Sequence, residues 1–514
     1  MSKKILCCAL CLLLALSLTG CMGGVEALNH GDTVTLQPAA AGPAAPTGDT
    51  NQEISQTVLL YVPGASGTRL IAQTERVTLS AARHPAEATL RQLFAFEGSE
   101  SAQPLSRDAR LQLSPVNPVE ISGGTATVNL GASALTLSHS DFYVVCQAIA
   151  NTLTQWGDIR AVNVLVSSTQ PGLDVGANVP AGCFIQNLTD GIDALTASAD
   201  AQAAASGDRR LSLTAILYYP AYSGKGILAE ARTVSFAGRA KPVLIESLLD
   251  ALSQTPQTLS NVPALPNLND YLSSPPAIQE IAVTGGQRVV LRFQQGFNDA
   301  LIAAGVPRSV MMAALTYTLT GFVPGINGVT VYIGEELVSS VVPAGIYEGA
   351  GETIQFNESI MRRSDFSAFL LANCTLYFGD GAGHLMAVRR PVPYYEVRSA
   401  RYLAGCLMQG PQNMDASPDA RAVLPVDLGD ADLLGVGLDG DTLLLNFSPR
   451  FAAAAADYDA EAERLLIYAV VNTLCELPAV RSVSFYINGT QPETLSGALY
   501  LPGKFMKNGS LVRE

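Results

Sequence analysis

The densest group of side chains that could bind a metal or transfer a proton is a set of acids near the C-terminus: Asp427, Asp430, Asp432, Asp439 and Asp441. A calcium site needs several oxygens that converge on one point, and these acids do not have the spacing of an EF-hand loop. Glycan hydrolysis needs two carboxyl groups in one cleft, and no pair stands out here. Asp439 and Asp441 flank an expected hairpin turn, where Asp is common. We therefore predict neither a metal site nor a catalytic pair of acids.

Other motifs of catalysis and cofactor binding are missing from the sequence. It contains no HExxH, GxSxG or GxxxxGK motif, and SGKG (223–226) lacks the upstream Gly of a phosphate loop. The histidines recur at no shared position, so we predict surface residues at His30, His84, His139 and His384. We predict no catalytic, cofactor-binding or metal-binding residues.

The cysteines beyond the N-terminal region show no CxxC spacing. They are Cys146, Cys183, Cys374, Cys406 and Cys475. Most fall at apolar positions, so we predict that they are small buried side chains. One disulfide among Cys374, Cys406 and Cys475 is the alternative.

One short motif with polar residues recurs three times. It reads IANTLTQW at 149–156, LTYTLTGF at 315–322 and VVNTLCEL at 470–477. Asn151 and Asn472 become Tyr317 in the second copy, a change that is hard to reconcile with a catalytic Asn. Apolar residues recur every three or four positions, as on a helix face that packs on a sheet. We therefore predict a folding motif, in which the Thr before Leu bonds to the carbonyl one turn earlier.

The elements that position this motif repeat with a long period. LLYVP (59–63), ILYYP (216–220) and TLYFG (375–379) predict the first strand of each copy, with Tyr61 and Tyr218 separated by 157 residues and Tyr218 and Tyr377 by 159. A period this long indicates duplicated domains. A helix, a hairpin with a glycine turn, the motif helix and a last strand follow in each copy. The order β-α-β-β-α-β predicts an α+β fold of three tandem domains, each a small sheet with two helices on one face.

The expected boundaries follow from these repeats and from composition. We predict domains at 57–189, 211–347 and 372–514, with linkers at 190–210 and 348–371. The second domain is the most divergent. Residues 21–56 are rich in Ala, Gly, Pro and Thr, which is typical of a disordered tether.

The first residues resemble the signal peptide of a bacterial lipoprotein. Residues 1–20 combine two lysines with an apolar run that is too short to span a bilayer comfortably. LTGC (18–21) resembles a lipobox, which implies cleavage before Cys21 and a diacylglycerol on its thiol. Two acyl chains anchor a protein stably, so we expect lipid anchoring at the extracytoplasmic face of the cell membrane. An ordinary secretory signal is the alternative.

The charge of the chain argues against nucleic-acid binding. The formal net charge is −14 and becomes −16 without the two signal-peptide lysines. No basic footprint accompanies it, so we predict no nucleic-acid partner.

The lipobox followed by these repeats resembles the GerMN-domain lipoproteins of sporulation and spore germination. The third copy has the best match, with TLYFGD, LAGCLMQGP, LDGDTLLLNFS and AVVNTLCELPAVRSVSFYING. The resemblance implies small α/β modules that build scaffolds in sporulation complexes, with envelope or sporulation-complex proteins as partners. It transfers no catalytic residues.

Our first hypothesis is a non-enzymatic scaffold lipoprotein, and three alternatives stay open. A peptidoglycan-binding module would need exposed aromatic residues shared by the copies, and Tyr61, Tyr218 and Tyr377 are the candidates. Their complete burial would remove the main support for that function. A solute-binding lipoprotein would need a deep interdomain cleft lined with polar groups. An uncharacterised hydrolase is the third.

Overall fold

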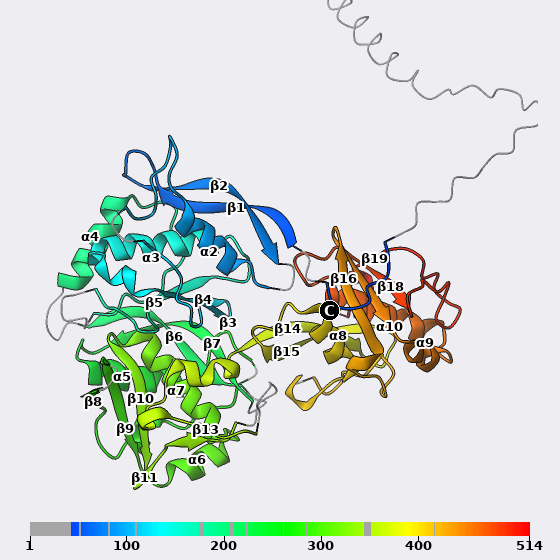
Figure 1. Ribbon diagram of the computed structural model, residues 1–514. Helices are drawn as coiled ribbons and strands as arrows, with labels where there is room; N and C mark the ends of the chain where they lie inside the picture. Colours follow the sequence, from blue (N-terminus) through cyan, green and yellow to red (C-terminus); the bar gives the residue numbers. More distant parts are fainter. Residues whose placement is uncertain are drawn as a thin grey trace, which may run out of the picture. The chain divides into compact units, whose positions relative to one another are not determined.

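The computed structural model describes residues 43–50, 53–80, 83–107, 110–173, 179–204, 210–221, 225–260, 262–282, 285–343, 351–415 and 417–513. The expected signal peptide, Cys21 and most of the expected tether lie outside these residues. Residues 45–514 form one compact unit. Helices and several small sheets are mixed within it, which confirms the α+β class (Figure 1).

Three segments, called repeats here, share one order of elements: a hairpin, a helix, two strands, a second helix and a last strand. The first repeat has β1 (Glu53–Pro63), β2 (Leu70–Ser80), α2 (Ala86–Ala95), β3 (Val119–Ser122), β4 (Thr125–Leu130), α3 (His139–Leu153) and β5 (Ala161–Val166). The second has β6 (Leu211–Pro220), β7 (Ile227–Phe236), α5 (Lys241–Ser253), β8 (Ala277–Glu280), β9 (Gln287–Phe293), α6 (Phe297–Ala303), α7 (Arg308–Phe322) and β10 (Ile326–Ile333). The third has β14 (Leu371–Gly379), β15 (Leu385–Pro393), α8 (Ala400–Met408), β16 (Leu433–Asp439), β17 (Thr442–Phe447), α9 (Pro449–Ala455), α10 (Ala460–Leu474) and β18 (Ser482–Ile487).

Each repeat has one strand and one sheet more than expected. The first strand pairs antiparallel with the next one, as β1–β2, β6–β7 and β14–β15, and each pair is a separate two-stranded sheet. Gly-rich turns such as PGASG (63–67) and GDGAG (379–383) join the two strands in the first and third repeats. Gly67 and Gly381 adopt φ of 70° and 75° there, in the region that favours glycine. These turns were the sequence signal for the missing strand.

The remaining strands of each repeat form a second sheet. Its orders are β3-β4-β5, β8-β9-β10 and β16-β17-β18, with β11 (Glu336–Leu337) and β19 (Phe505–Met506) added at the edges of the second and third. The first two strands are antiparallel and the last two parallel, because the second helix carries the chain across between them. The predicted glycine turns close the first two strands, with Gly123, Gly124, Gly285, Gly286 and Gly440 at positive φ.

The second helix of each repeat contacts both sheets, so the expected arrangement of two helices on one free face is not observed. Helix α7 contacts β6 and β10, and its residues from Ser309 to Phe322 are all buried. Helix α3 likewise contacts β1 and β5. A helix enclosed on both sides must be apolar or internally bonded around its whole circumference, which explains the Thr-rich sequence LTYTLTGF.

The recurring NTL or YTL motif joins this helix to the hairpin. Its threonine Oγ1 accepts a hydrogen bond from the backbone N–H of the tyrosine that the three first strands share, at 3.0 Å in every repeat. The pairs are Thr152 with Tyr61, Thr318 with Tyr218, and Thr473 with Tyr377. The motif thus has a folding role. We expected the Thr hydroxyl to bond to a carbonyl of its own helix, but it accepts a hydrogen bond from the first strand.

The Asn of the motif has a structural partner as well. Asn151 donates to the Asn187 carbonyl at 2.7 Å and accepts from the Asn187 N–H at 2.8 Å. Asn472 makes the same two bonds with Asn508, at 3.0 and 2.8 Å. Each side-chain amide thus donates to and accepts from the backbone of one residue, as a neighbouring strand would. These two bonds fix the segment after β5 or β18 to the motif helix.

The segments predicted as linkers contain ordered structure. Helix α4 (Ile192–Ala204) occupies most of 190–210 and packs on α3 through buried Leu195 and Ala199. Within 348–371, Phe356, Phe366 and Phe369 belong to the core of the second repeat. Their burial removes large apolar surfaces from water, which a solvated linker would leave exposed.

The end of the expected tether is also ordered. Strand β1 begins at Glu53, and residues 45–50 contact the third repeat. Two short strands, β12 (Ser340–Val341) and β13 (Ile354–Gln355), form a further pair.

Within the described residues, no single helix combines the length and hydropathy needed to cross a membrane. Helices α6 and α7 together reach that length and composition, but the chain bends by 105° between them.

Candidate ligand pocket at the junction of the three repeats

The three repeats meet where strands β3, β7 and β14 come together. The Ser122 hydroxyl at the end of β3 accepts from the Ala229 N–H of β7 at 3.0 Å and donates to the Leu371 carbonyl of β14 at 2.5 Å. Its neighbour Gly123 has φ of 57°, and a Cβ there would lie 1.7 Å from the Ala229 carbonyl oxygen. Only glycine allows this approach, so the β3–β4 turn serves as a contact between repeats as well as a turn.

A buried ion pair joins the first and second repeats beside this junction. Arg363 Nη2 donates to Glu120 Oε2 at 2.6 Å, and the two side chains are only 4% and 2% exposed. The Tyr317 hydroxyl donates to Glu120 Oε1 at 2.9 Å, and the Arg363 guanidinium lies 3.9 Å from the Tyr317 ring centre. Burial alone would lower the pKa of Arg363, but the Glu120 carboxylate raises it above its usual value, so the guanidinium keeps its charge.

Tyr317 stands where the other motif copies have Asn, and its role was only partly predicted. Its side chain is fully buried, as expected for a packing position, and burial raises the pKa of its hydroxyl well above the usual value. It also bonds to Glu120, which lies 197 residues away in the sequence. The substitution in the second copy therefore replaces a bond within a repeat by a bond between repeats.

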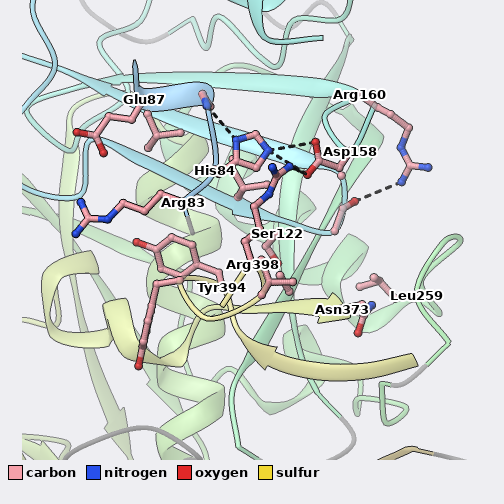
Figure 2. Close-up of a pocket in the computed structure, with 18 of the residues that line it drawn as sticks. Arg83, His84, Glu87, Ser122, Asp158, Arg160, Leu259, Asn373, Tyr394 and Arg398 are labelled. Carbon is pink, nitrogen blue, oxygen red and sulfur yellow. Dashed lines mark hydrogen bonds and ion pairs between the residues drawn. The ribbon is translucent and has the colours of Figure 1, made fainter. Parts of the chain in front are cut away.

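A pocket of about 540 Å³ lies beside these contacts, and all three repeats line it. Figure 2 shows it between the start of α2, the loop before β5 and the segment after β15. The charged and polar residues that line it are Arg83, His84, Glu87, Ser122, Asp158, Arg160, Thr258, Asn373, Arg389, Tyr394, Tyr395 and Arg398. A solute-binding protein was expected to have a deep interdomain cleft lined with polar groups; this pocket lies between repeats, and its lining is partly charged and partly apolar.

An ionic network spans one wall of the pocket. His84 Nε2 lies 3.1 and 3.0 Å from the two carboxylate oxygens of Asp158, and Arg398 Nη2 donates to Asp158 Oδ2 at 3.0 Å (Figure 2). The Ala86 N–H donates to His84 Nδ1 at 3.1 Å, so Nδ1 carries no proton and Nε2 carries one. His84 is half-buried within this network, and the prediction of a surface histidine is wrong there.

Both titratable groups of the network have a lowered pKa. Burial lowers the pKa of His84, against the opposing effect of the Asp158 hydrogen bond. Burial would raise the pKa of Asp158, but the hydrogen bonds and charges of His84 and Arg398 lower it far below its usual value. A general base needs a pKa near the working pH, and Asp158 is too weak a base.

The pocket has an excess of cationic groups although the chain is acidic. Four arginines line it, against the two acids Glu87 and Asp158. Both acids already have cationic partners, since Glu87 pairs with Arg91 at 2.6 Å and Asp158 with Arg398. Figure 2 shows the guanidinium groups of Arg83 and Arg160 extending to opposite sides. The excess of positive charge favours an anionic ligand over a cationic one.

The other residues considered from the sequence do not meet in a site. His139 and His384 are exposed and pair with Asp200 and Asp380, while His30 lies outside the described residues. Asp432 is buried and accepts bonds from Ser448 Oγ and the Gly429 N–H. In the described part of the chain, no three His, Cys, Asp or Glu side chains are grouped to hold a metal ion.

The described cysteines are all free. Cys146, Cys374 and Cys406 are buried, as predicted, and Cys183 and Cys475 are half-buried. The alternative of a disulfide among Cys374, Cys406 and Cys475 is therefore not observed. Burial raises the pKa of Cys406 to about 11, so its thiol is protonated at neutral pH and is a poor nucleophile.

Comparison with known proteins identifies the family through the third repeat. Residues 375–493 match the sequence model of the Germane family, described as sporulation and spore germination. The third repeat is a GerMN domain. The resemblance inferred from TLYFGD and the NTL helix is confirmed, and the family places this GerMN-domain protein among those of sporulation and spore germination. The matched range covers one repeat. The division of the chain into three repeats therefore rests on the order of its elements and not on three matches to the family.

Solved structures with similarity to this GerMN-domain protein come from two bacteria. The tandem GerMN domains of the sporulation protein GerM from Bacillus subtilis are 15% identical over 59% of this chain and 100% of that chain, with a TM-score of 0.23. The first GerMN domain of the same protein is 22% identical over 27% and 98%, with a TM-score of 0.22. A lipoprotein from Clostridium perfringens is 20% identical over 27% and 88%, with a TM-score of 0.19. No curated protein sequence matches the chain.

Proposed function

We propose that this GerMN-domain protein is a non-enzymatic scaffold that assembles or localises a sporulation or germination complex. The observation that carries the proposal is the set of buried contacts between repeats, above all the Glu120–Arg363 pair. A buried charge pair contributes little net stability but strongly penalises any arrangement that breaks it. Such contacts fix the repeats relative to one another, which suits a scaffold that must hold several binding surfaces in one arrangement.

We further propose that the scaffold is attached to the extracytoplasmic face of the cell membrane through a lipid on Cys21. The LTGC sequence at 18–21 supports this assignment. Metabolic labelling with a fatty-acid analogue should mark the wild-type chain and leave a Cys21→Ser variant unmarked. Equal labelling of both chains would contradict the proposed anchor.

Cross-linking in the cells that produce the protein tests the scaffold proposal. The chain would be cross-linked during growth and during sporulation, purified, and its attached molecules identified. We expect an envelope or sporulation-complex protein that recurs between experiments and depends on the stage. Recovery of peptidoglycan fragments alone would instead favour a wall-binding module.

The shared tyrosine position gives the peptidoglycan alternative little support. Tyr218 and Tyr377 are only 2% and 5% exposed, and Tyr61 is half-buried. Buried rings cannot stack on a sugar, so the shared aromatic position offers no common glycan platform.

A second candidate function is the binding of a small anionic solute in the junction pocket. The excess of arginines and the interdomain position favour it. Inorganic phosphate and a set of dicarboxylates can be tested by the shift in melting temperature that each one causes. A true ligand should raise the melting temperature of wild type and of Arg308→Ala, whose ion pair with Glu336 lies outside the pocket lining. It should not stabilise Arg83→Ala or Arg160→Ala, and equal stabilisation of all four chains would exclude this site.

A further inference from the structure

The junction pocket has an apolar wall in addition to its charged groups. Each repeat contributes to this wall, which consists of Val119 and Ile121 from the first, Leu259 from the second, and Tyr394 and Val397 from the third. All five side chains are half-buried, and they pack against the cores of three different repeats. Protein interiors are packed almost without voids, so apolar side chains that border one cavity in this way leave apolar surface that a ligand can cover.

The aromatic part of the pocket comes from the segment after β15. The Tyr394 and Tyr395 rings meet edge to face, with their centres 5.7 Å apart and their planes at 84°. Burial raises the pKa of the Tyr394 hydroxyl, so this group is protonated at neutral pH. The ring therefore adds apolar surface to the pocket and no charge that would repel an anion.

Arg160 is placed to bind the charged end of a ligand. Its Nη2 donates to the Gly123 carbonyl at 3.4 Å (Figure 2), and its guanidinium lies against Gly124, where a Cβ would be 2.7 Å from Nη2. Among the described residues no carboxylate pairs with Arg160. A guanidinium that is held by one carbonyl keeps further N–H groups for a carboxylate or a phosphate.

We propose that the junction pocket binds an amphiphilic organic anion, with a carboxylate or phosphate head at Arg160 and an apolar body on the apolar wall. The inference rests on the second candidate function proposed above, and it narrows the ligand from any small anion to this class. The pocket volume of about 540 Å³ is in the range of sites that enclose small organic molecules, and it is much larger than an inorganic ion needs.

A series of straight-chain carboxylates tests both parts of the ligand. The full chain with Cys21→Ser, which removes the proposed lipid, would be titrated by calorimetry with propionate, butyrate, pentanoate and hexanoate. The affinity should rise about threefold to fourfold with each CH₂ that is buried on the apolar wall. Hexan-1-ol, which lacks the charge, should bind at least about tenfold more weakly than hexanoate. Hexyl phosphate serves as the second anion, and the tighter of the two identifies the head group that the site prefers.

Two variants with matched controls locate the head and the body of the ligand. Arg160→Gln should weaken hexanoate binding at least about tenfold, whereas Arg308→Gln, outside the pocket lining, should leave it unchanged. Leu259→Asn should weaken hexanoate binding at least about fivefold and propionate binding by less. Leu265→Asn is its control, because Leu265 is half-buried in the same loop but does not line the pocket. Circular dichroism of each variant without ligand checks that it folds.

The outcomes separate this inference from the function on which it rests. If inorganic phosphate and propionate bind as tightly as hexanoate, or if Leu259→Asn binds hexanoate as wild type does, the ligand class is wrong and anion binding at the pocket still stands. If no anion binds, or if Arg160→Gln binds hexanoate as tightly as wild type, both are overturned.

Discussion

Removal of the Glu120 carboxylate should destabilise the contact between the first two repeats more than any comparable change at the surface. In a Glu120→Gln variant, Arg363 stays buried at 4% exposure and loses the one charged partner that it has among the described residues. Breaking a buried ion pair on one side costs about 3–5 kcal/mol, because the remaining charge is left uncompensated in a poorly solvating environment.

The matched control is Glu336→Gln. It breaks the Arg308–Glu336 pair, in which the side chains are 34% and 54% exposed. Exposed pairs contribute about 0–1 kcal/mol, so this variant should unfold almost as wild type does. Replacement of both buried partners, Glu120→Leu with Arg363→Met, should cost less than the single change. We expect about 1–3 kcal/mol, because the Tyr317 hydroxyl still loses its acceptor.

Urea unfolding of the full chain, followed by tryptophan fluorescence, measures these differences. The chain has a single tryptophan, Trp156, which packs against the core of the first repeat, so the signal reports that repeat. A chain of several repeats need not unfold in one step, and far-UV circular dichroism should be recorded alongside. The reasoning fails if Glu120→Gln costs no more than Glu336→Gln.

Three further predictions address the motif, the junction turn and the pocket. Thr473→Val should cost about 1–3 kcal/mol in urea unfolding, because the buried Tyr377 N–H loses its acceptor; an unchanged midpoint would argue against this role of the motif. Gly123→Ala should destabilise the chain well beyond Gly285→Ala, since both have positive φ but only the first would clash with backbone; equal melting temperatures would refute the close contact. The pKa of Asp158 is lower in the folded chain than in the unfolded chain. Its contribution to stability is therefore present above the pKa of the unfolded chain, and it is lost as the pH falls through the pKa of the folded chain. An Asp158→Asn variant should therefore lose less stability than wild type between about pH 6 and pH 2, and parallel curves would contradict the ionic network.

Much of the fold could be predicted because its signals are local. The glycine turns at Gly123-Gly124 and Gly285-Gly286 and the apolar stripe of the NTL helices depend on residues a few positions apart. The extra hairpin strand was also within reach, since a glycine-rich turn and an alternating strand follow the first strand. Strand β2 has only two buried residues and so gives a weak apolar pattern, whereas β7 and β15 are mostly buried and have a stronger one.

The candidate pocket could not be predicted by the same means. No sequence motif links the residues of its ionic network. His84 and Asp158 are 74 residues apart, and Asp158 and Arg398 are 240 residues apart. Their common location depends on how the first and third repeats meet. The ordered position of residues 45–50 was missed for a similar reason. Their Ala-, Gly- and Pro-rich sequence does not show that Gly435 and Gly437 of β16 leave room for them.

By itself the sequence determined the repeats, their α+β class, the motif helix and the family to which the third repeat belongs. Each of these depends on periodic burial and turn geometry within a single repeat. Only the tertiary structure decided that Tyr317 and Arg363 meet Glu120, that Ser122 of the first repeat contacts the other two, and that residues 45–50 lie on β16. Glu120 and Arg363 are 243 residues apart, and periodicity specifies which face of an element is buried but not which other surface buries it.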